Sequence, residues 1–290
     1  MTLFNQLLNG IQIGSIYALV ALGYSMVYGI VRLINFAHGD IIMVGAYTTW
    51  FLLTRLGFPV WGSVVSAIVF CALLGIFIEK VAYKPLRNSA RISLLITAIG
   101  ISFFLQNLVQ LLFKADPRVM PNFFEGTVPL FGTSMPLVTV VVIVVSVCLT
   151  AGLTQLVNKT KIGKAMRAVS EDQDAAQLMG ININTTISFT FGIGSALAAV
   201  AAILYVSSYS QISPTMGSML GIKAFVAAVL GGIGSIPGAV MGGLLIGVME
   251  SLTKGYISSR LADAVVFTVL IIVLLIRPTG ILGKRSNEKV

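Results

Sequence analysis

The sequence carries little charge. Only 10% of its 290 residues are Asp, Glu, Lys or Arg, whereas about a quarter is usual in soluble globular proteins. Hydrophobic residues make up 57% of the chain, and its mean hydropathy is +0.96. These values exclude a water-soluble globular protein. Because charge-free apolar runs reach the roughly 20 residues that cross a bilayer, we expect residues 1–290 to form a single transmembrane domain.

Residues that build metal centres and nucleophilic sites are also scarce. There is one histidine, His38, and there are two cysteines, Cys71 and Cys148, without CxxC or Cys/His spacing. The sequence has no HExxH, GxSxG or phosphate-loop motif, so we expect no catalytic residue, no metal and no cofactor. Both cysteines are expected to be buried and inert. If ATP drives this protein, another chain must hydrolyse it.

The basic residues fall into three clusters between the apolar runs. The clusters are Lys80, Lys84, Arg87 and Arg91; Lys159, Lys161, Lys164 and Arg167; and Lys284, Arg285 and Lys289. Short loops rich in Lys and Arg lie on the cytoplasmic side of membrane proteins, so we expect all three clusters to be cytoplasmic. The formal net charge of +9 then reflects membrane orientation, and we expect no nucleic-acid partner.

Eight apolar segments are candidate spans of an all-α polytopic membrane protein. They are residues 9–31, 41–54, 60–79, 93–113, 137–157, 187–207, 222–250 and 261–276. The second and the eighth are shorter than a bilayer requires, so we expect tilted or partial spans there. Residues 114–136 are expected to form an extracytoplasmic loop, and residues 158–186 a cytoplasmic loop.

The seventh segment contains the run LGGIGSIPGAVMGG at residues 230–243. Each glycine weakens a helix by about 1 kcal/mol and each proline by about 3 kcal/mol. The second and third basic clusters must also be separated by an even number of crossings, which three unbroken helices do not give. We therefore expect a break into two partial or re-entrant pieces of about a dozen residues each, facing the translocation pathway, because irregular backbone at membrane depth lines cavities.

The alternative is that these glycines only allow close helix packing. The pathway residues expected from the break are Gly231, Gly232, Gly234, Ser235, Pro237 and Gly238.

A second interruption lies at residues 35–40, where NFAHGD separates two apolar segments. Interrupted segments in both halves of a membrane protein point to a transporter's binding site. A half-helix that begins near Asp40 would direct backbone N–H groups toward a substrate carboxylate. Alternatively, the stretch is a cytoplasmic turn with Asp40 as a helix cap. The pathway residues expected here are Asn35, Phe36, His38, Gly39 and Asp40.

The loop at residues 158–186 has the pattern of a short capped helix. Ser170 and Gln173 match a capping box, acidic residues occupy the first turn, and Gly180 ends the pattern. We expect a helix from Glu171 to Met179. Such a short helix needs a partner to hold it, so we favour docking to another subunit over an unattached surface loop. The expected docking residues are Arg167, Ser170, Glu171, Asp172 and Gly180.

Several blocks of the sequence resemble, nearly end to end, the permease subunits of ABC importers for branched-chain amino acids, the LivH-like proteins. These blocks are NGIQIGSIYALVALGYSMVYGIVRLINFAHGD, EKVAYKPLR, LLITAIGISFFLQN, GKAMRAVSEDQDAAQLMGIN, GIKAFVAAVLGGIGSIPGAVMGG and RPTGILG.

The resemblance implies half of a type II-like importer in the bacterial cytoplasmic (inner) membrane. A second, similar permease subunit would complete the pore, two cytoplasmic ATP-binding subunits would dock on the coupling loops, and an extracytoplasmic substrate-binding protein would deliver hydrophobic amino acids. It also implies that Ala175, Ala176 and Gly180 belong to the ATPase-coupling motif, although the charged EDQD run departs from that motif. Relatives that move urea or short amides leave the substrate open.

Two other classes of protein are weaker interpretations. An ion-coupled secondary transporter needs intramembrane acids on a proton or cation path. Asp40 with His38 is the one candidate, because the other acids near span ends have basic neighbours: Glu79 beside Lys80, Glu250 beside Lys254, and Asp263 beside Arg260. A membrane-embedded enzyme lacks any clustered nucleophile, acid–base pair or ligand set.

Overall fold

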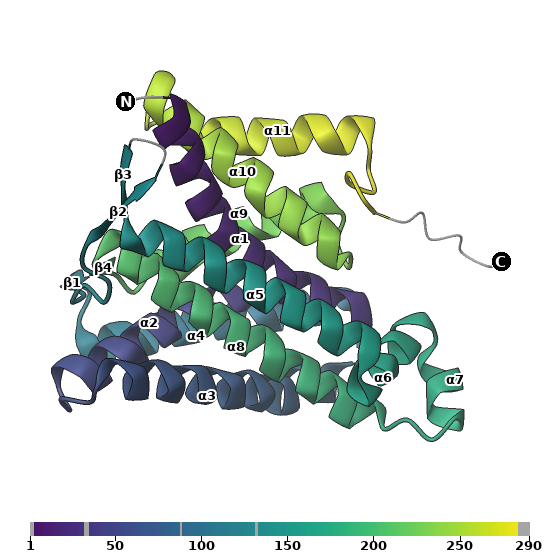
Figure 1. Cartoon of the computed structure of the whole chain (residues 1–290). Coiled ribbons are helices and arrows are strands. Elements are labelled where there is room, and N and C mark those ends of the chain that lie inside the picture. The colour runs from purple at the N-terminus through teal and green to yellow at the C-terminus, as the bar shows by residue number, and fades with distance from the viewer. Residues whose placement is uncertain (1–2, 32–34, 88, 131–132, 284–290) are drawn as a thin grey trace.

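In the computed structural model, which describes residues 3–31, 35–87, 89–130 and 133–283, the chain forms a bundle of helices (Figure 1). The long helices are α1 (Leu3–Val31), α3 (Val60–Ile78), α4 (Arg91–Phe113), α5 (Leu137–Lys159), α8 (Ile183–Tyr209) and α10 (Ile236–Tyr256). Shorter helices are α2 (His38–Thr54), α6 (Lys161–Glu171), α7 (Gln173–Leu178), α9 (Met216–Gly231) and α11 (Ala262–Ile276). A π-helical turn η1 (Glu79–Tyr83) and a 3-10 turn η2 (Lys84–Leu86) continue α3.

Six of the described helices are long and apolar enough to cross a membrane, whereas the sequence predicted eight spans. They are the six long helices above, with α3 extended through η1 and η2. α2, α9 and α11 have 17, 16 and 15 residues and are shorter than the roughly 20 residues that a perpendicular span needs. The described bundle therefore combines helices of full spanning length with the shorter α2, α9 and α11.

The loop after α4 contains short strands, so the expectation of an all-α chain was wrong there. β1 (Arg118–Val119) pairs antiparallel with β4 (Gln211–Ile212), and β2 (Thr127–Leu130) pairs with β3 (Thr133–Pro136). β1 follows α4 and β4 precedes α9. The β1–β4 pair thus ties α4 to α9 at one end of the bundle.

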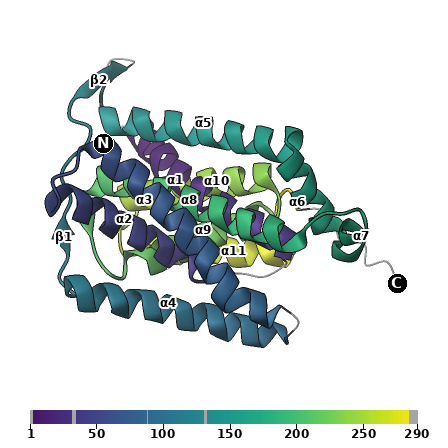
Figure 2. The same ribbon diagram turned by 90° about the horizontal axis from the view of Figure 1, so that it is seen from below.

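α1 and α8 form the centre of the bundle, and α10 packs along α1 in the opposite direction. Gly10 and Gly14 of α1 lie against Val248 and Leu244 of α10, where an added Cβ would come within 2.8 Å of the facing Cα. Small residues let helices approach in a bilayer, which supplies no hydrophobic drive between them. α4 and α5 flank the centre on opposite sides (Figure 2). Cys148 is exposed on α5, contrary to the expectation that it is buried.

The first two basic clusters lie at the same end of the bundle, as predicted. Gln173 of α7 donates to the backbone oxygen of Ile30 at 3.5 Å, and Arg87 donates to Oδ1 of Asn184 at 2.8 Å. Figure 1 shows α6, α7 and the C-terminal segment at this end, and the N-terminus and the strands at the other. The third cluster, at residues 284–289, falls outside the described residues.

The glycine run separates two helices, as predicted, but the pieces differ from the expectation. α9 has 16 residues and ends at Gly231, while α10 has 21 and begins at Ile236. The turn between them lies beside the last turn of α1, where a Cβ added to Gly29 would be 3.7 Å from the Gly234 Cα. The break is therefore a turn at the end of the bundle that carries α6 and α7, and α10 is long enough to be a full span.

Candidate functional site

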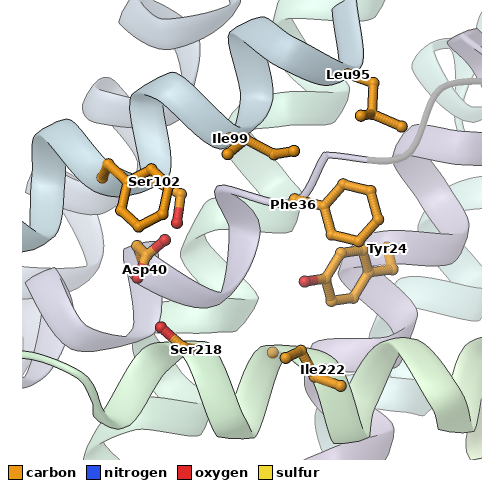
Figure 3. A pocket seen from close by; sticks show the side chains of 10 residues that line it. Tyr24, Phe36, Asp40, Leu95, Ile99, Ser102, Ser218 and Ile222 are labelled. Atoms are coloured by element: carbon orange, nitrogen blue, oxygen red, sulfur yellow. The ribbon is translucent and has the colours of Figure 1, made fainter. Parts of the chain in front are cut away.

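A cavity of about 270 Å³ lies between α1, the start of α2, α4 and α9 (Figure 3). This volume suits a small molecule, since pockets for larger ligands have about 300–1,000 Å³. The lining residues are Tyr24, Phe36, Asp40, Leu95, Ile99, Ser102, Phe103, Ser218, Gly221 and Ile222. Phe36 and Asp40 are the predicted pathway residues among them. Sequence reasoning missed the contributions of α4 and α9, because nothing in the sequence places these helices side by side.

The cavity exists because α2 begins inside the bundle. His38, the first residue of α2, packs against Gly23 of α1, eight residues before α1 ends at Val31. Eight residues of helix rise about 12 Å. A helix that begins near Asp40, as predicted, is thus present. The alternative of a turn capped by Asp40 was wrong, because the N-cap is Ala37 and Asp40 lies in the first turn.

Asp40 forms the polar edge of the cavity together with neutral side chains. Gln106 Nε2 donates to Asp40 Oδ1 at 3.0 Å and also contacts Ser102 Oγ at 3.1 Å and Ser218 Oγ at 2.9 Å. Asp40 is 1% exposed, and no Lys or Arg in the described part of the chain forms an ion pair with it. An acid inside a membrane bundle is costly, so its presence marks a functional site.

The opposite edge of the cavity is apolar and aromatic. Figure 3 shows Phe36, Leu95 and Ile222 across the cavity from Asp40, with the Tyr24 ring beside them. Phe225 packs against Phe36, with the two ring centroids 5.7 Å apart. The cavity therefore offers a negative charge at one side and apolar surface at the other.

The first-turn amides of α2 are not available to a substrate carboxylate, contrary to the expectation. The amides of His38, Asp40 and Ile41 donate to backbone oxygens at 3.0, 3.1 and 3.3 Å. The chain before α2 folds back so tightly that it satisfies these donors itself.

The other predicted residues of this stretch surround the cavity without lining it. His38 is buried between Gly23 and Gly194, and its ring meets that of Tyr24 edge-on with centroids 4.8 Å apart. Asn35 Oδ1 accepts a hydrogen bond from the Tyr83 hydroxyl at 2.7 Å. A direct role of Asn35, His38 and Gly39 in the pathway stays a prediction.

The second predicted stretch lies away from the cavity, and its residues build the α9–α10 turn. Gly232 and Gly234 have φ values of +107° and +87°, a region that favours glycine. Ser235 caps α10, since its Oγ accepts the Gly238 amide at 3.2 Å, and Pro237 follows in the first turn. Gly231 packs against the Gly238 backbone. These contacts explain why the α9–α10 turn needs these residues. Their place in a pathway stays a prediction.

The C-terminal segment completes this turn. The amides of Ile281 and Leu282 donate to the backbone oxygens of Leu230 and Gly231, both at 2.9 Å. The last carbonyl groups of a helix have no partner within it. The RPTGILG block thus satisfies the end of α9.

The loop at residues 158–186 contains two helices where one was predicted. The basic run forms α6, and Asp172 is the N-cap of α7, with its Oδ1 accepting the Ala175 amide at 2.9 Å. The expected capping box at Ser170 was wrong, because Ser170 and Glu171 form the last turn of α6. Ser170 Oγ donates to the Arg167 backbone oxygen at 2.7 Å. α6 extends this far because it is amphipathic and buries an apolar face, consisting of Gly163, Met166 and Val169.

The predicted end of the helix at Gly180 is confirmed. Gly180 has φ +82°, and its amide donates to the Gln177 oxygen at 2.9 Å. The Ile181 amide donates to the Ala176 oxygen at 3.0 Å. This pair of bonds is the Schellman motif, which needs a left-handed residue after the helix.

α7 presents a small apolar face to the outside. Ala176 is buried, whereas Ala175 is exposed, and Leu178 and Met179 are 89% and 82% exposed. Neighbouring apolar side chains that are exposed on a helix outside the membrane are typical of a surface that contacts another protein. Sequence reasoning had found Ala175 but missed Leu178 and Met179, which follow it at helical spacing.

A buried polar group connects α8 to η1. Glu79 is 0% exposed and accepts hydrogen bonds from Arg87 and Ser188, and Arg87 also bonds to Asn184 near the start of α8. π-helical turns such as η1 occur frequently at functional sites. The pairing of Glu79 with Arg87, rather than with its neighbour Lys80, became visible only in the structure.

The remaining acids within the bundle are also paired. Glu250 accepts hydrogen bonds from Lys223 at 2.8 Å, Lys254 at 2.6 Å and the Tyr17 hydroxyl at 2.7 Å. Asp263 pairs with Lys223 at 2.6 Å, where the sequence had suggested Arg260. These pairs join α1, α9, α10 and α11. Of the acids that are buried in the described part of the bundle (Asp40, Glu79 and Glu250), Asp40 is the one without an ion pair.

Comparison with known proteins agrees with this arrangement. Residues 6–274 match the family described as branched-chain amino acid transport system / permease component. The chain is 46% identical to the high-affinity branched-chain amino acid transport system permease protein BraD of Pseudomonas aeruginosa, and 44% identical to its counterpart LivH of Escherichia coli. Each match covers 98% of this chain and 97% of the relative.

A solved structure, PsaBC from Streptococcus pneumoniae in complex with Fab, matches with a TM-score of 0.50 at 14% identity. The match covers 96% of this chain and 93% of that one, and it supports the fold alone.

Proposed function

Because the chain belongs to the permease family of branched-chain amino acid transport systems, we propose that it forms half of the translocation pathway of an ATP-driven importer for branched-chain and other hydrophobic amino acids. It works with a second permease subunit, two cytoplasmic ATP-binding subunits and an extracytoplasmic substrate-binding protein. The observation that carries the proposal is the identity of 44–46% over nearly the whole chain to high-affinity permeases.

Two features of the structure support this proposal, one for the substrate and one for the ATP-binding subunits. The cavity between α1, α2, α4 and α9 accommodates a small amphiphilic substrate. At the end of the bundle that carries the basic clusters, α7 offers Ala175, Leu178 and Met179 to an ATP-binding subunit. The end with the basic clusters then faces the cytoplasm, and the N-terminus of α1 faces the opposite side.

The alternatives have less support. The names of the relatives favour amino acids over urea and short amides. An ion-coupled transporter would have Asp40 as its proton site, since Glu79, Glu250 and Asp263 are paired with basic residues.

Uptake by the purified importer in proteoliposomes tests the function. We expect leucine uptake to require ATP on the α7 side and the substrate-binding protein on the other, and to persist when ion gradients are collapsed. The variant Ala175→Arg keeps a good helix former in α7 but places a long charged side chain on its exposed face. It should release the ATP-binding subunits or uncouple ATP hydrolysis from uptake.

The matched control is Lys164→Arg on α6, which preserves the charge of an exposed residue outside α7. Uptake that follows an ion gradient without any ATP-binding subunit would contradict the proposed function. Normal uptake by Ala175→Arg with normally bound ATP-binding subunits would remove α7 as the docking element.

A further inference from the structure

The chemistry of the cavity narrows the substrate class. We propose that Asp40, held by Gln106, is a transient binding site for the α-ammonium group of an aliphatic amino acid, whose side chain lies against the Phe36 wall. This inference rests on the proposed function and deepens it, because it assigns one residue of this chain to substrate selectivity.

Asp40 is a buried acid with a neutral partner. The residue is 1% exposed, and Gln106 donates to one of its carboxylate oxygens at 3.0 Å. Ser102 and Ser218 complete a ring of neutral groups around Gln106. Neutral donors orient a carboxylate without supplying positive charge, and a buried acid that is to stay ionised needs a cationic partner, without which it takes up a proton. A cationic group is the complement that the described residues do not supply at this position.

The Asp40 carboxylate is held in place by contacts between helices. Gln106 lies on α4, and its amide nitrogen donates to Asp40 on α2, to Ser218 on α9 and to Ser102 on α4 itself. The backbones of α2 and α9 meet beside it, where a Cβ added to Gly39 would lie 2.5 Å from the Gly217 oxygen. Three helices thus fix the Asp40 side chain at the cavity edge.

The wall of the cavity across from Asp40 is apolar. Across from Asp40, Figure 3 shows Phe36, Leu95 and Ile222, and the Tyr24 hydroxyl points toward the polar side. A cation alone would gain nothing from this apolar wall. A molecule with a compact ammonium group and a branched apolar chain satisfies both edges within about 270 Å³. Urea and short amides carry no charge to match Asp40 and little apolar surface to match Phe36.

The experiment uses the assembled importer with its substrate-binding protein and a photoactivatable leucine analogue that bears a diazirine in its side chain. In the native importer, we expect the analogue to cross-link to the α4 segment around Ile99 or to the α9 segment around Ile222, and unlabelled leucine to compete. Asp40→Asn keeps the size of the side chain and an acceptor for Gln106 but removes the charge. It should reduce cross-linking and leucine uptake about tenfold or more, as expected for a lost charge-assisted hydrogen bond.

Two further variants and one readout distinguish substrate binding by Asp40 from a purely structural role of this residue. Asp40→Glu keeps the charge and should recover part of the cross-linking. Asp116→Asn is the same change at an exposed acid outside the cavity that has no ion pair among the described residues, and it should leave cross-linking within twofold of the native value. The elution volume of the complex should be unchanged in Asp40→Asn, because the substitution should leave the assembly intact.

Each other outcome has a definite meaning. Normal uptake and cross-linking by Asp40→Asn would overturn the inference while leaving the proposed function intact. Dissociation of the permease pair in Asp40→Asn would show that Asp40 pairs with a basic residue of the other subunit, which also overturns it. Absence of leucine uptake by the native importer would instead count against the proposed function.

Discussion

The two ends of α7 each depend on one residue. Asp172 accepts the Ala175 amide at 2.9 Å at the start, and Gly180 with φ +82° reverses the chain at the end. The sequence predicts Gly180 correctly, because only glycine adopts this conformation without strain. It misplaces the start, since Ser170 and Asp172 are both good caps and the choice depends on how far α6 stays packed.

Removing the cap of α7 should therefore loosen this helix. Asp172→Ala is expected to cost about 1 kcal/mol of helix stability, whereas Ser170→Ala should cost much less because Ser170 caps nothing. Hydrogen exchange of the Ala175 and Ala176 amides in the purified complex measures the difference. Faster exchange in Ser170→Ala than in Asp172→Ala would restore the capping box that the sequence suggested.

Two short helices, α2 and α9, form the part of the bundle next to the cavity. They meet through Gly39 and Gly217, whose backbones touch, and Gly221 lies against the Gly39 Cα. The sequence predicts that both segments are interrupted, since glycine and proline break helices locally. Their depths do not follow from it, because the packing of His38 against Gly23 and Gly194 and the docking of residues 281–282 onto α9 are contacts between distant parts of the chain.

The α2–α9 contact has no room for a side chain. Gly217→Val should separate the two helices, destabilise the chain by about 1–3 kcal/mol as overpacking typically does, and lower uptake by moving Ser218 and Asp40 apart. The matched control is Gly100→Val on α4, where an added Cβ meets nothing within 4 Å. Thermal unfolding of the solubilised complex measures both. An equal effect of the two variants would contradict a packing role for Gly217.

In the whole molecule, the proposed coupling end carries α6 and α7, and the cavity lies between α1, α2, α4 and α9. The basic clusters predict the coupling end, because charge asymmetry is a property of the sequence alone. The cavity escapes prediction because Gln106, Ser102 and Ser218 are common polar residues in apolar helices, and only their convergence on Asp40 marks them. The count of eight spans fails for a related reason, since hydropathy does not reveal where a helix begins inside the bundle.

Thiol labelling of Ser218→Cys shows whether substrate passes through the cavity. The background carries Cys148→Ser, because Cys148 is exposed, and retains the buried Cys71. Ser235→Cys, at the α9–α10 turn away from the cavity, is the control. We expect a small water-soluble methanethiosulfonate to modify Ser218→Cys in the assembled importer and abolish leucine uptake, and leucine delivered by the binding protein to slow that modification. Modification of Ser218→Cys without loss of uptake, or with a rate that leucine does not change, would contradict a pathway through this cavity.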